Sequence, residues 1–485
     1  MESAMMDYVD LNSMAVDLDA VGLVPEPLAR EHLLLAVGLN GEALMTVTTG
    51  TVSSFALEEV RERTGRELIL CRSEAAPLRR AIGYYYAELE ARKTALISSS
   101  SVEGGDVVRL LESLIRLAIA ARASDIPIEP YETETLVRMR IDGVIQDHQT
   151  LPGTLHPALI ARVKVLGELD ITERRLPQDG HFRFQTEEGS VNIRVSVLPT
   201  VFGEKAVLRL LAIEGQVEDY AGHFGMNQEI YRRFLPLLSV PNGMIYLTGP
   251  TGSGKSTTLY MILEYLAQGH VNISTIEDPV EKNLRRVNQT QVNVTAGLTF
   301  EKGLRAILRQ DPDIIMVGET RDGETAEIAV RAAITGHLVF STLHTNSAVS
   351  SVLRLADMGV EPYLIANSLV GVVAQRLLRK TCPDCGREVE ATEEERSFWG
   401  ASSVRRGAGC PGCSGTGYRG RIAIHELLTI DRPIRRMIAE GKNMESIEEY
   451  ARKTQGLRTL KEQAAELVRR GVTTPEEALR IANYE

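Results

Sequence analysis

The sequence predicts an α/β protein whose centre is a mainly parallel sheet, preceded by an α+β domain and a smaller α/β module. Two observations support this prediction. Strand-like apolar runs alternate with helical segments from about residue 226 to 380, and a glycine-rich stretch, 249–256, directly follows one of those runs. Such alternation is typical of parallel strands whose connecting helices cover both faces of the sheet.

Length and composition indicate a globular protein of several domains. The chain has 485 residues, of which 44% are hydrophobic and 25% are charged. No stretch approaches the roughly 20 uninterrupted apolar residues of a membrane-spanning helix, and Met1–Asp10 lacks the features of a secretory signal. We therefore expect a cytoplasmic protein. Its net charge of −11 makes nucleic acid an unfavourable partner.

Changes in periodicity and composition divide the chain into segments. A serine tract, Ser98–Ser101, and the following Gly104-Gly105 have the composition of a flexible linker. The predicted segments are a small N-terminal module at residues 1–92, a linker at 93–105, an arginine-bearing α+β domain at 106–215, a phosphate-loop domain at 216–380, a tetracysteine subdomain at 381–420 and a C-terminal helical lobe at 421–485.

The N-terminal module combines helical spacing with strand-like alternation after a lead-in, residues 1 to about 21, that has no clear period. Cys71 lies in an apolar segment, where we expect a buried and inert thiol. The expected elements are helices at 25–35, 56–63 and 77–86 and strands at 43–47 and 67–70.

The arginine-bearing domain opens with an amphipathic helix and continues with strands. Apolar residues between Val107 and Ala118 fall on one helical face, and Asp142-Gly143 is typical of a hairpin turn. The expected strands are 135–141, 182–184, 191–197 and 205–210. Most arginines near its turns are expected to be solvated surface residues. They are Arg138, Arg140, Arg174, Arg175, Arg183 and Arg194.

Four apolar runs in the phosphate-loop domain are expected to be strands of the sheet, and each of them ends in polar residues. The runs are 244–248, 272–277, 313–317 and 338–342. In doubly wound folds the ligand lies beyond the carboxyl ends of the strands. Polar residues that directly follow these four runs should therefore converge on one site.

The stretch 249–256 has the spacing of a phosphate-binding loop, in the strand-to-helix context that such a loop requires. Glycines allow the main chain to approach a diphosphate closely, and the N-terminus of the following helix adds partial positive charge. Lys255 would reach the β- and γ-phosphates, and the Ser256 hydroxyl would bind Mg²⁺. The candidate nucleotide-binding residues are Gly249, Pro250, Thr251, Gly252, Ser253, Gly254, Lys255, Ser256 and Thr257.

Acidic and histidine residues beside the other strands are candidates for the chemistry. Glu277 ends the second run and could hold Mg²⁺ through water or polarise an attacking water. Glu319 follows the third run and is the leading candidate for the general base, because a strand-end carboxylate can reach within about 3 Å of such a water. His337 and His344 flank the fourth run, and either could contact phosphate.

Four of the five cysteines form two Cys-x-x-Cys pairs, Cys382/Cys385 and Cys410/Cys413. Two such pairs, each beside small residues that permit a tight turn, can place four thiolates tetrahedrally around Zn²⁺. Four thiolates leave no open coordination position, so we expect a structural zinc site rather than a catalytic one.

The C-terminal lobe, from Ile424 to the end, is charged and is expected to be helical. The expected helices are 444–451, 460–470 and 475–482.

Together these motifs make the chain resemble the type II secretion and type IV pilus assembly ATPases, from about Gly22 to Glu485. The tetracysteine segment and the following residues 417–421 match assembly ATPases and differ from the related retraction motors. Four further segments carry the resemblance: the phosphate loop at 249–256, an aspartate box at 275–281, an atypical Walker B motif at 311–319 and a histidine box at 335–346.

The resemblance implies both a fold and an activity. A RecA-like ATPase domain would follow a PAS-like α+β domain, and a homo-hexameric ring would hydrolyse ATP with Mg²⁺ to assemble pilins or pseudopilins. The implied partners are an inner-membrane platform protein and a membrane-anchored docking protein that binds the N-terminal module. These partners would hold a cytoplasmic protein at the inner membrane.

In this family, arginines of the α+β domain approach the γ-phosphate when the ring closes, where a cation would stabilise transition-state charge. His181 stands where the family usually has arginine, so Arg194 is our first choice for this role and Arg183 is a substitute. Pro127 stands where histidine is usual, and we expect no role for it.

Two other functions remain open from the sequence. A ring translocase acting on nucleic acid would share these motifs, although the acidic net charge disfavours it. An ATP-binding scaffold would bind nucleotide without turnover and leave Glu319 idle. The motifs also do not separate the secretion branch from the pilus branch. We see no arginine-leucine-glycine repeat of the kind that binds cyclic dinucleotides in some relatives, so we do not expect that ligand.

Overall fold

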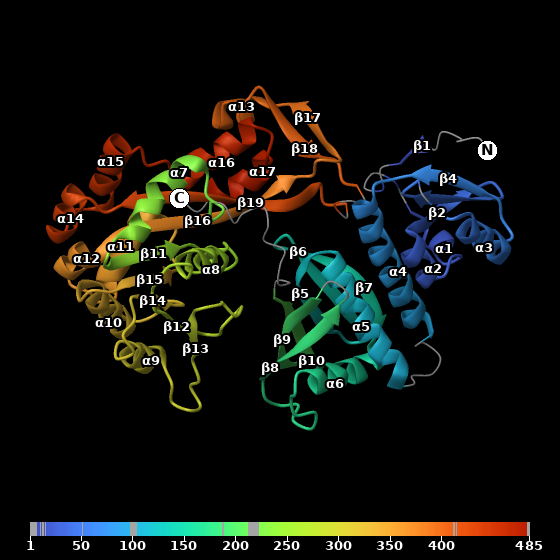
Figure 1. Cartoon of the computed structure of the whole chain (residues 1–485), viewed down its shortest axis with the longest axis horizontal. Coiled ribbons are helices and arrows are strands. Elements are labelled where there is room, and N and C mark those ends of the chain that lie inside the picture. Colours follow the sequence, from blue (N-terminus) through green and yellow to red (C-terminus); the bar gives the residue numbers. More distant parts are fainter. Residues whose placement is uncertain are drawn as a thin grey trace. The chain divides into compact units, whose positions relative to one another are not determined.

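The computed structural model describes residues 7–9, 11, 14, 16–50, 52–97, 104–186, 189–211, 223–410, 413, 415–482 (Figure 1). The fold is α/β, as expected, and the described residues form four sheets. The chain separates into two compact units. The first comprises Met1–Gln216, Cys382–Cys385 and Gly407–Arg419, and the second comprises Val217–Thr381, Gly386–Arg406 and Gly420–Glu485.

The N-terminal part of the first unit is a four-stranded sheet, in the order β1-β4-β3-β2, with its own hydrophobic core. Leu34, Val47 and Leu78 are buried in this core, and so is the thiol of Cys71, as expected. The elements are β1 (Asp7–Tyr8), α1 (Leu18–Val21), α2 (Glu26–His32), β2 (Leu34–Asn40), β3 (Ala43–Thr48), α3 (Ser54–Thr64), β4 (Leu68–Arg72) and α4 (Ala75–Ile97).

Three details of this region differ from the sequence expectations. The helix expected at 25–35 ends at His32, because Leu33 adopts a left-handed conformation (φ 49°) and β2 begins at the next residue. The lead-in contributes β1, which pairs in parallel with β4. The expected linker at 93–105 is helical up to Ile97 and again from Gly104, and its middle lies outside the described residues.

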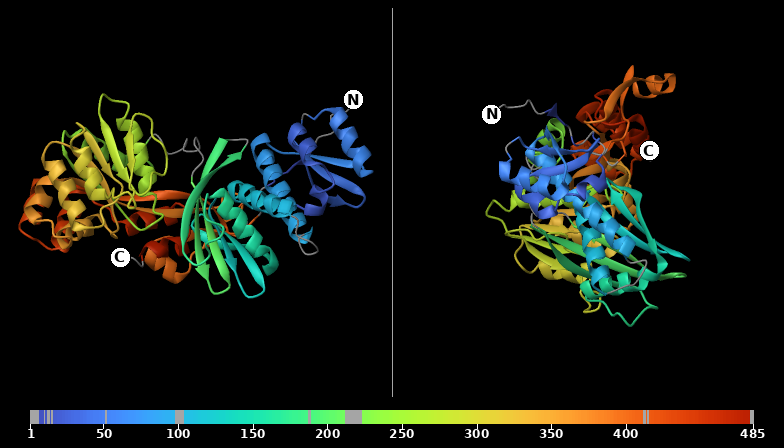
Figure 2. Two further views of the ribbon diagram at one scale, coloured as in Figure 1. Left: turned by 90° about the horizontal axis from the view of Figure 1, so that it is seen from below. Right: turned by 90° about the vertical axis from the view of Figure 1, so that its right-hand side faces the viewer.

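The second part of the first unit is a six-stranded antiparallel sheet in the order β7-β6-β5-β10-β9-β8. Two helices, α5 and α6, pack on one of its faces and share a single core with it (Figure 2). The elements are α5 (Gly104–Ala120), β5 (Ala123–Pro130), β6 (Glu134–Ile141), β7 (Val144–Pro152), a 3₁₀ turn (Gly153–Leu155), α6 (His156–Leu166), β8 (Gln178–Thr186), β9 (Gly189–Thr200) and β10 (Gly203–Leu210).

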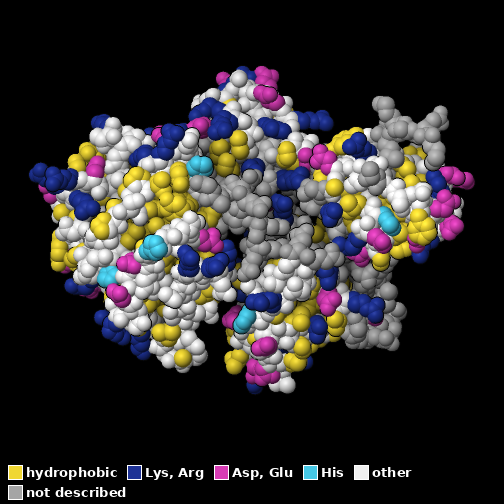
Figure 3. All heavy atoms as spheres, in the orientation of Figure 1, with side chains coloured by type: hydrophobic (Ala, Val, Ile, Leu, Met, Phe, Trp, Pro, Cys, Tyr) yellow, Lys and Arg dark blue, Asp and Glu magenta, His cyan; other side chains and the backbone are white. Residues whose placement is uncertain are grey.

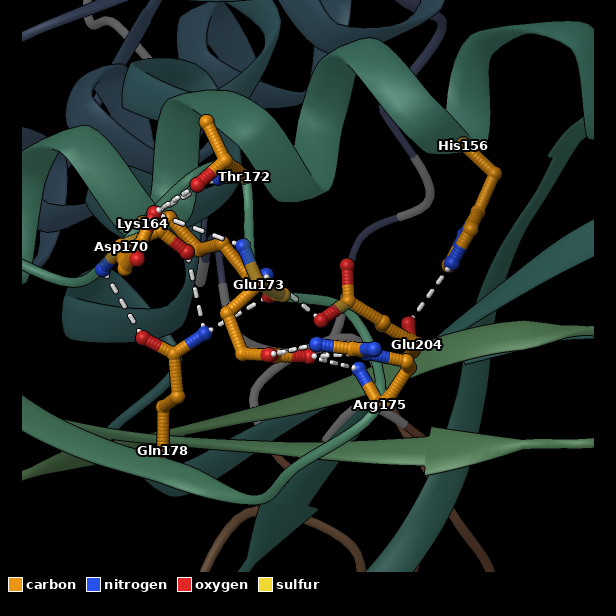
Figure 4. A network of polar contacts seen from close by, with 8 residues as sticks. All are labelled: His156, Lys164, Asp170, Thr172, Glu173, Arg175, Gln178 and Glu204. Atoms are coloured by element: carbon orange, nitrogen blue, oxygen red, sulfur yellow. Dashed lines mark hydrogen bonds and ion pairs between the residues drawn. The ribbon is translucent and has the colours of Figure 1, made fainter.

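Polar contacts hold the connection between α6 and β8 (Figure 4). The Lys164 side chain is only 1% exposed; its Nζ donates to the Glu173 carbonyl oxygen (2.7 Å) and pairs with Glu204 Oε1 (2.6 Å). Gln178 Nε2 donates to the same Glu173 carbonyl (2.9 Å). The connection that carries Arg174 and Arg175 is therefore held at Glu173 by side chains of both α6 and β8.

The second unit is built on a seven-stranded sheet in the order β13-β12-β14-β15-β11-β16-β19 (Figure 1). Successive residues of β11 enter two different cores: Met244 and Tyr246 lie in one, and Ile245 and Leu247 in the other. Because strand side chains alternate between faces, both faces of this sheet are covered. The strands are β11 (Gly243–Thr248), β12 (Ile273–Glu277), β13 (Asn288–Gln291), β14 (Ile314–Val317), β15 (Leu338–Leu343), β16 (Leu369–Thr381) and β19 (Tyr418–Thr429).

The remaining elements of the second unit are mostly helices. None of the helices in the described part of the chain is long and apolar enough to cross a bilayer. The elements are α7 (Gln228–Phe234), a 3₁₀ turn (Leu235–Ser239), α8 (Lys255–Leu266), α9 (Phe300–Ile307), α10 (Gly323–Ile334), α11 (Ala348–Asp357), α12 (Pro362–Ser368), β17 (Gly386–Glu390), α13 (Glu393–Trp399), β18 (Ser403–Gly407), α14 (Arg432–Ala439), α15 (Met444–Gln455), α16 (Leu460–Arg469) and α17 (Pro475–Ala482).

The expectation that the chain is helical from Ile424 onward is wrong for its first residues. Strand β19 continues to Thr429 and forms an edge of the main sheet. Leu427 and Leu428 are buried in different cores, which is the alternation of a strand. The three helices expected further on are present as α15, α16 and α17.

A buried histidine in β19 makes the second unit sensitive to acid. His425 is 1% exposed, and burial lowers its pKa to about 3. An unfolded histidine titrates near 6.5, so its protonation in the unfolded chain opposes folding as the pH falls below that value. At pH 5 this single group should cost about 2 kcal/mol, since each pH unit below 6.5 is worth about 1.4 kcal/mol.

We predict that His425→Gln loses less stability on acidification than the parent does. Urea unfolding of both proteins at pH 7 and pH 5 would measure this, and the difference between their pH-dependent losses should be about 2 kcal/mol. Equal losses in the two proteins would show that His425 is not buried in the neutral form.

Candidate active site

The glycine-rich loop connects the end of β11 to the start of α8, as the sequence predicts. Gly249, Gly252 and Gly254 have φ values of 149°, 79° and 88°, which side chains disfavour. A Cβ at Gly249 would lie 2.5 Å from the Gln375 carbonyl oxygen. The loop therefore needs glycine both for its backbone conformation and for its close approach to β16.

Lys255 is a buried cation inside this loop. It is 8% exposed, and its Nζ donates to the carbonyl oxygens of Gly249 (2.6 Å) and Pro250 (3.1 Å). Burial is the main cause that lowers the pKa of Lys255 to about 8; the charge of Arg376 adds to the effect and that of Glu319 opposes it. Ser256, in the first turn of α8, is exposed, so its hydroxyl is accessible to a cation.

Two of the sequence-predicted groups lie together at the carboxyl edge of the sheet. Glu319 follows β14, and its side chain is 18% exposed. Its Oε1 accepts from Arg321 (2.5 Å), and its Oε2 lies 3.8 Å from Nε2 of His344, which follows β15. Burial lowers the pKa of His344; the charges of Lys255 and Arg321 add to this, and Glu319 opposes it.

The carboxylate of Glu277, at the end of β12, is held inside the protein. Glu277 is 3% exposed, and it accepts hydrogen bonds from the hydroxyls of Tyr260 and Thr275 (2.5 Å from Thr275 Oγ1) and from Gln289 Nε2 (3.0 Å). These donors occupy both of its oxygens. The geometry therefore favours Glu319 over Glu277 as a base that acts on water.

The structure does not bring His337 to the phosphate loop. His337 precedes β15, and its carbonyl accepts from the amide of Gly243, which begins β11. The loop follows the other end of β11, and a strand of six residues spans roughly 20 Å. The ring of His337 lies 3.0 Å, Nδ1 to oxygen, from the Ala332 carbonyl. Of the two candidate histidines, His344 is therefore the one that lies near the phosphate loop within the chain.

The candidate arginines lie in the first unit. Arg194 in β9 is in register with His181 of β8 on one side and with Arg209 of β10 on the other. Its strand neighbours Ile193 and Val195 are buried, so Arg194 lies on the face of the sheet opposite the helices.

Arg183 lies two residues beyond His181 on the same strand, and it is in register with Asn192 of β9. Its Nε donates to Asn192 Oδ1 at 3.3 Å. Residues two apart on a strand point to the same side, so Arg183 and Arg194 lie on the same face of the sheet.

Sequence reasoning missed two residues of the site, Gln375 and Arg376 in β16. Gln375 Nε2 donates to the carbonyl of Ser253 (2.9 Å), and Arg376 Nη2 donates to the carbonyl of Asn346 (3.1 Å). The one signal available was a pair of polar residues inside the apolar run of β16. That signal does not show that β16 lies beside β11.

The four paired cysteines form a cluster that could hold a metal ion. Their sulfur atoms all lie within 4.8 Å of one another. Cys382 and Cys410 are 3.8 Å apart, as are Cys385 and Cys413. Four sulfurs at about 2.3 Å from a tetrahedral zinc ion would be about 3.8 Å apart.

Backbone amides also support a thiolate in this cluster. The amides of Cys410 and Gly417 each lie 3.2 Å from the Cys413 sulfur. Hydrogen bonds to a charged sulfur stabilise it. The donor set therefore fits a closed, four-sulfur metal site.

Comparisons with known proteins extend over nearly the whole chain. The family model described as Type II/IV secretion system protein matches residues 100–480, and the MshEN domain model matches residues 4–92. The type IV pilus assembly ATPase PilB of Thermus thermophilus is 42% identical over 97% of this chain and 56% of its own length. The type II secretion system ATPase E of Vibrio cholerae is 44% identical over 79% of this chain and 76% of its own length.

Solved structures show the same fold. The pilus retraction motor PilT with bound ADP has a TM-score of 0.52 at 28% identity, over 76% of this chain and 96% of its own. The ATPase DotB of Legionella pneumophila has a TM-score of 0.56 at 21% identity, over 77% of this chain and 95% of its own. The resemblance found in the sequence is thus confirmed: the chain belongs to the Type II/IV secretion system protein family, whose named members include ATPases.

Proposed function

We propose that this protein is a motor ATPase that hydrolyses ATP with Mg²⁺ to drive assembly of a pseudopilus or a type IV pilus. The observation that carries the proposal is the buried Lys255 in a glycine-rich loop after β11, with Glu319 at the same edge of the sheet after β14. That pair supplies what phosphoryl transfer needs: a cation for the phosphates and a carboxylate for the attacking water. The names of the relatives support this reaction.

The proposed roles follow from the positions of the side chains. Backbone amides of the loop and Lys255 bind the β- and γ-phosphates, and Ser256 would hold Mg²⁺, which supplies positive charge for the reacting phosphate. Glu319 accepts the proton of the water. His344 lies beside Glu319 and can contact the γ-phosphate or orient the carboxylate.

We also propose that an arginine of the α+β domain completes the nucleotide site. Arg194 is the first choice and Arg183 the substitute, because His181 occupies the position where the family usually has arginine. A guanidinium supplied as the γ-phosphate departs would stabilise the charge that develops in the transition state. In a homo-hexamer such an arginine would arrive with domain movement.

The proposed partners are proteins at the inner membrane. The chain spans 56% of the length of the Thermus thermophilus relative, so the name of that relative does not establish the partners of this chain. They are an inner-membrane platform protein and a membrane-anchored docking protein for the N-terminal module, which would hold a cytoplasmic motor at the membrane.

The surface and the net charge disfavour nucleic acid as a partner (Figure 3). On the face drawn in Figure 3, basic and acidic side chains occur in small separate groups. The net charge of the chain is −11. Both observations disfavour broad binding to a phosphate backbone.

The tetracysteine cluster is proposed to bind Zn²⁺ and to act structurally. Four sulfur ligands would close the coordination sphere, so the ion would fix the two knuckles rather than take part in hydrolysis.

We predict that Glu319→Gln lowers kcat for ATP hydrolysis at least a hundredfold while ATP binding persists. Glutamine keeps the size of the side chain and removes its basicity, and a general base contributes about 10²–10⁴-fold. Steady-state kinetics and equilibrium binding measure the two quantities. Glu277→Gln is the matched control, which should lower thermal stability more and turnover less. Hydrolysis at the parental rate in Glu319→Gln would refute the assignment.

We predict that Lys255→Ala abolishes nucleotide binding and turnover and leaves the fold intact. The lysine is a buried charge that belongs to none of the hydrophobic cores, so its removal relieves a desolvation penalty without removing a core side chain. Binding of a fluorescent ADP analogue and thermal unfolding without nucleotide test the two parts. A variant that still turns over ATP would overturn the site itself.

We predict one zinc ion per purified chain, lost in Cys410→Ser. Elemental analysis by mass spectrometry counts the ion, and thermal unfolding should show a lower midpoint in the variant because four thiolates can no longer close the site. Ser414→Ala, next to the second pair, is the control that should keep the metal. Purified parent protein without zinc would contradict the prediction.

A further inference from the structure

Strand β16 brings two buried polar residues to the phosphate loop from more than a hundred residues away in the chain. It runs parallel to β11, and Ala374 is in register with Thr248, the last residue before the loop. Gln375 and Arg376 therefore lie where the loop begins. They are 2% and 4% exposed, so both are as buried as the core around them.

Gln375 contacts both ends of the loop. Its Nε2 donates to the Ser253 carbonyl at 2.9 Å, and the same nitrogen lies 2.8 Å from the position of a Cβ at Gly254. The main-chain carbonyl oxygen of Gln375 lies 2.5 Å from the position of a Cβ at Gly249. The first and last glycines of the loop thus pack against one residue of the neighbouring strand.

The Arg376 guanidinium lies between the loop and the segment that follows β15. Its Nη1 donates to the Gln375 carbonyl at 3.0 Å, and the same nitrogen is 2.9 Å from the position of a Cβ at Gly249. Its Nη2 donates to the Asn346 carbonyl at 3.1 Å and lies 3.4 Å from Asn346 Oδ1. One side chain therefore connects the phosphate loop with the segment that carries His344.

Lys255 and Arg376 place two buried positive charges in the region of the phosphate loop. Lys255 and Arg376 are two buried cations that act on each other, and Glu319 is the carboxylate that also acts on Lys255. Glu319 is itself paired with Arg321. Like charges that lie close together raise each other's free energy, and a diphosphate or triphosphate bound beside both would lower it.

One buried polar atom of the phosphate loop and one of β16 still have hydrogen-bonding capacity. Ser253 Oγ and Gln375 Oε1 are buried and have no hydrogen-bond partner among the described residues. Buried groups of this kind normally satisfy their bonds with a ligand or water. Both lie in the wall of the loop, where a phosphate or its hydration shell could supply the partner.

We infer that Gln375 and Arg376 are positioning residues of the nucleotide site: Gln375 fixes the shape of the loop, and Arg376 joins it to the Asn346 segment and adds a second buried cation for the phosphates. This inference rests on the proposed nucleotide site. It differs from a purely structural role for β16 in one respect, because it requires that affinity depends on the number of phosphates.

The test compares substitutions on β16 by their effects on ADP, ATP and AMP affinity. Arg376→Gln should weaken ADP and ATP binding at least tenfold, which corresponds to about 1.4 kcal/mol, and should change AMP binding less. KM for ATP should rise more than kcat falls, because the cation acts on bound and reacting nucleotide alike. Arg376→Lys should recover part of the affinity because it keeps the charge.

Arg379→Gln on the same strand is the matched control. Arg379 pairs with Glu477 of α17 at 2.7 Å, away from the loop. This variant should lower the thermal unfolding midpoint while leaving the affinity for ADP unchanged. If Arg376→Gln does not fold, Gln375→Leu and Asn346→Ala test the same connection, and each should weaken ADP binding severalfold.

The outcomes separate this inference from the proposed function. A parent protein that binds no ADP would remove the nucleotide site and the inference with it. A parent that binds ADP, with variants at Gln375, Arg376 and Asn346 that bind it equally well, would overturn the inference alone. An equal loss for AMP and ADP would also overturn it, because the effect would then not reach the phosphates.

Discussion

The close approach of the glycine loop to β16 is the constraint on which the rest of the site depends. A Cβ atom at Gly249 would lie 2.5 Å from the main-chain carbonyl oxygen of Gln375, so this position of the loop requires glycine. Because β11 lies between β15 and β16, this one turn receives polar groups from both neighbours. The site is therefore assembled by the order of strands in the sheet, and parallel strands place their carboxyl ends at the same edge.

This arrangement has an electrostatic consequence. Lys255 and Arg376 are almost completely buried, whereas the carboxylate of Glu319 remains partly exposed and shares its charge with Arg321. Two cations in a region of low dielectric repel each other, and the charge of Arg376 contributes to lowering the pKa of Lys255. In the proposed nucleotide site, affinity for phosphate would arise from charges that folding has already buried, so binding would not need to order or desolvate them again.

Some of this could be predicted from the sequence, for physical reasons. Strands β11, β12, β14 and β15 are short apolar runs because both faces of the sheet are covered, and the polar residues after them follow from where the runs stop. The role of β16 could not be predicted, because no local pattern shows which strand pairs with β11. Strand β5 is not among the expected strands, and it contains Pro127, a residue that central strands disfavour. Strand β19 is not expected either, because its charged residues mask the alternation of Leu427 and Leu428.

The division of the cations between two units matters for the proposed motor. Lys255 and Arg376 belong to the second unit, and Arg194 belongs to the first. A ligand can shift a conformational equilibrium only by its difference in affinity for the two states. If an arginine of the first unit reaches the γ-phosphate in one state alone, ATP favours that state and ADP, lacking that phosphate, does not. Hydrolysis would then remove the contact that favours that state, so the loss of one phosphate would shift the equilibrium back toward the other state.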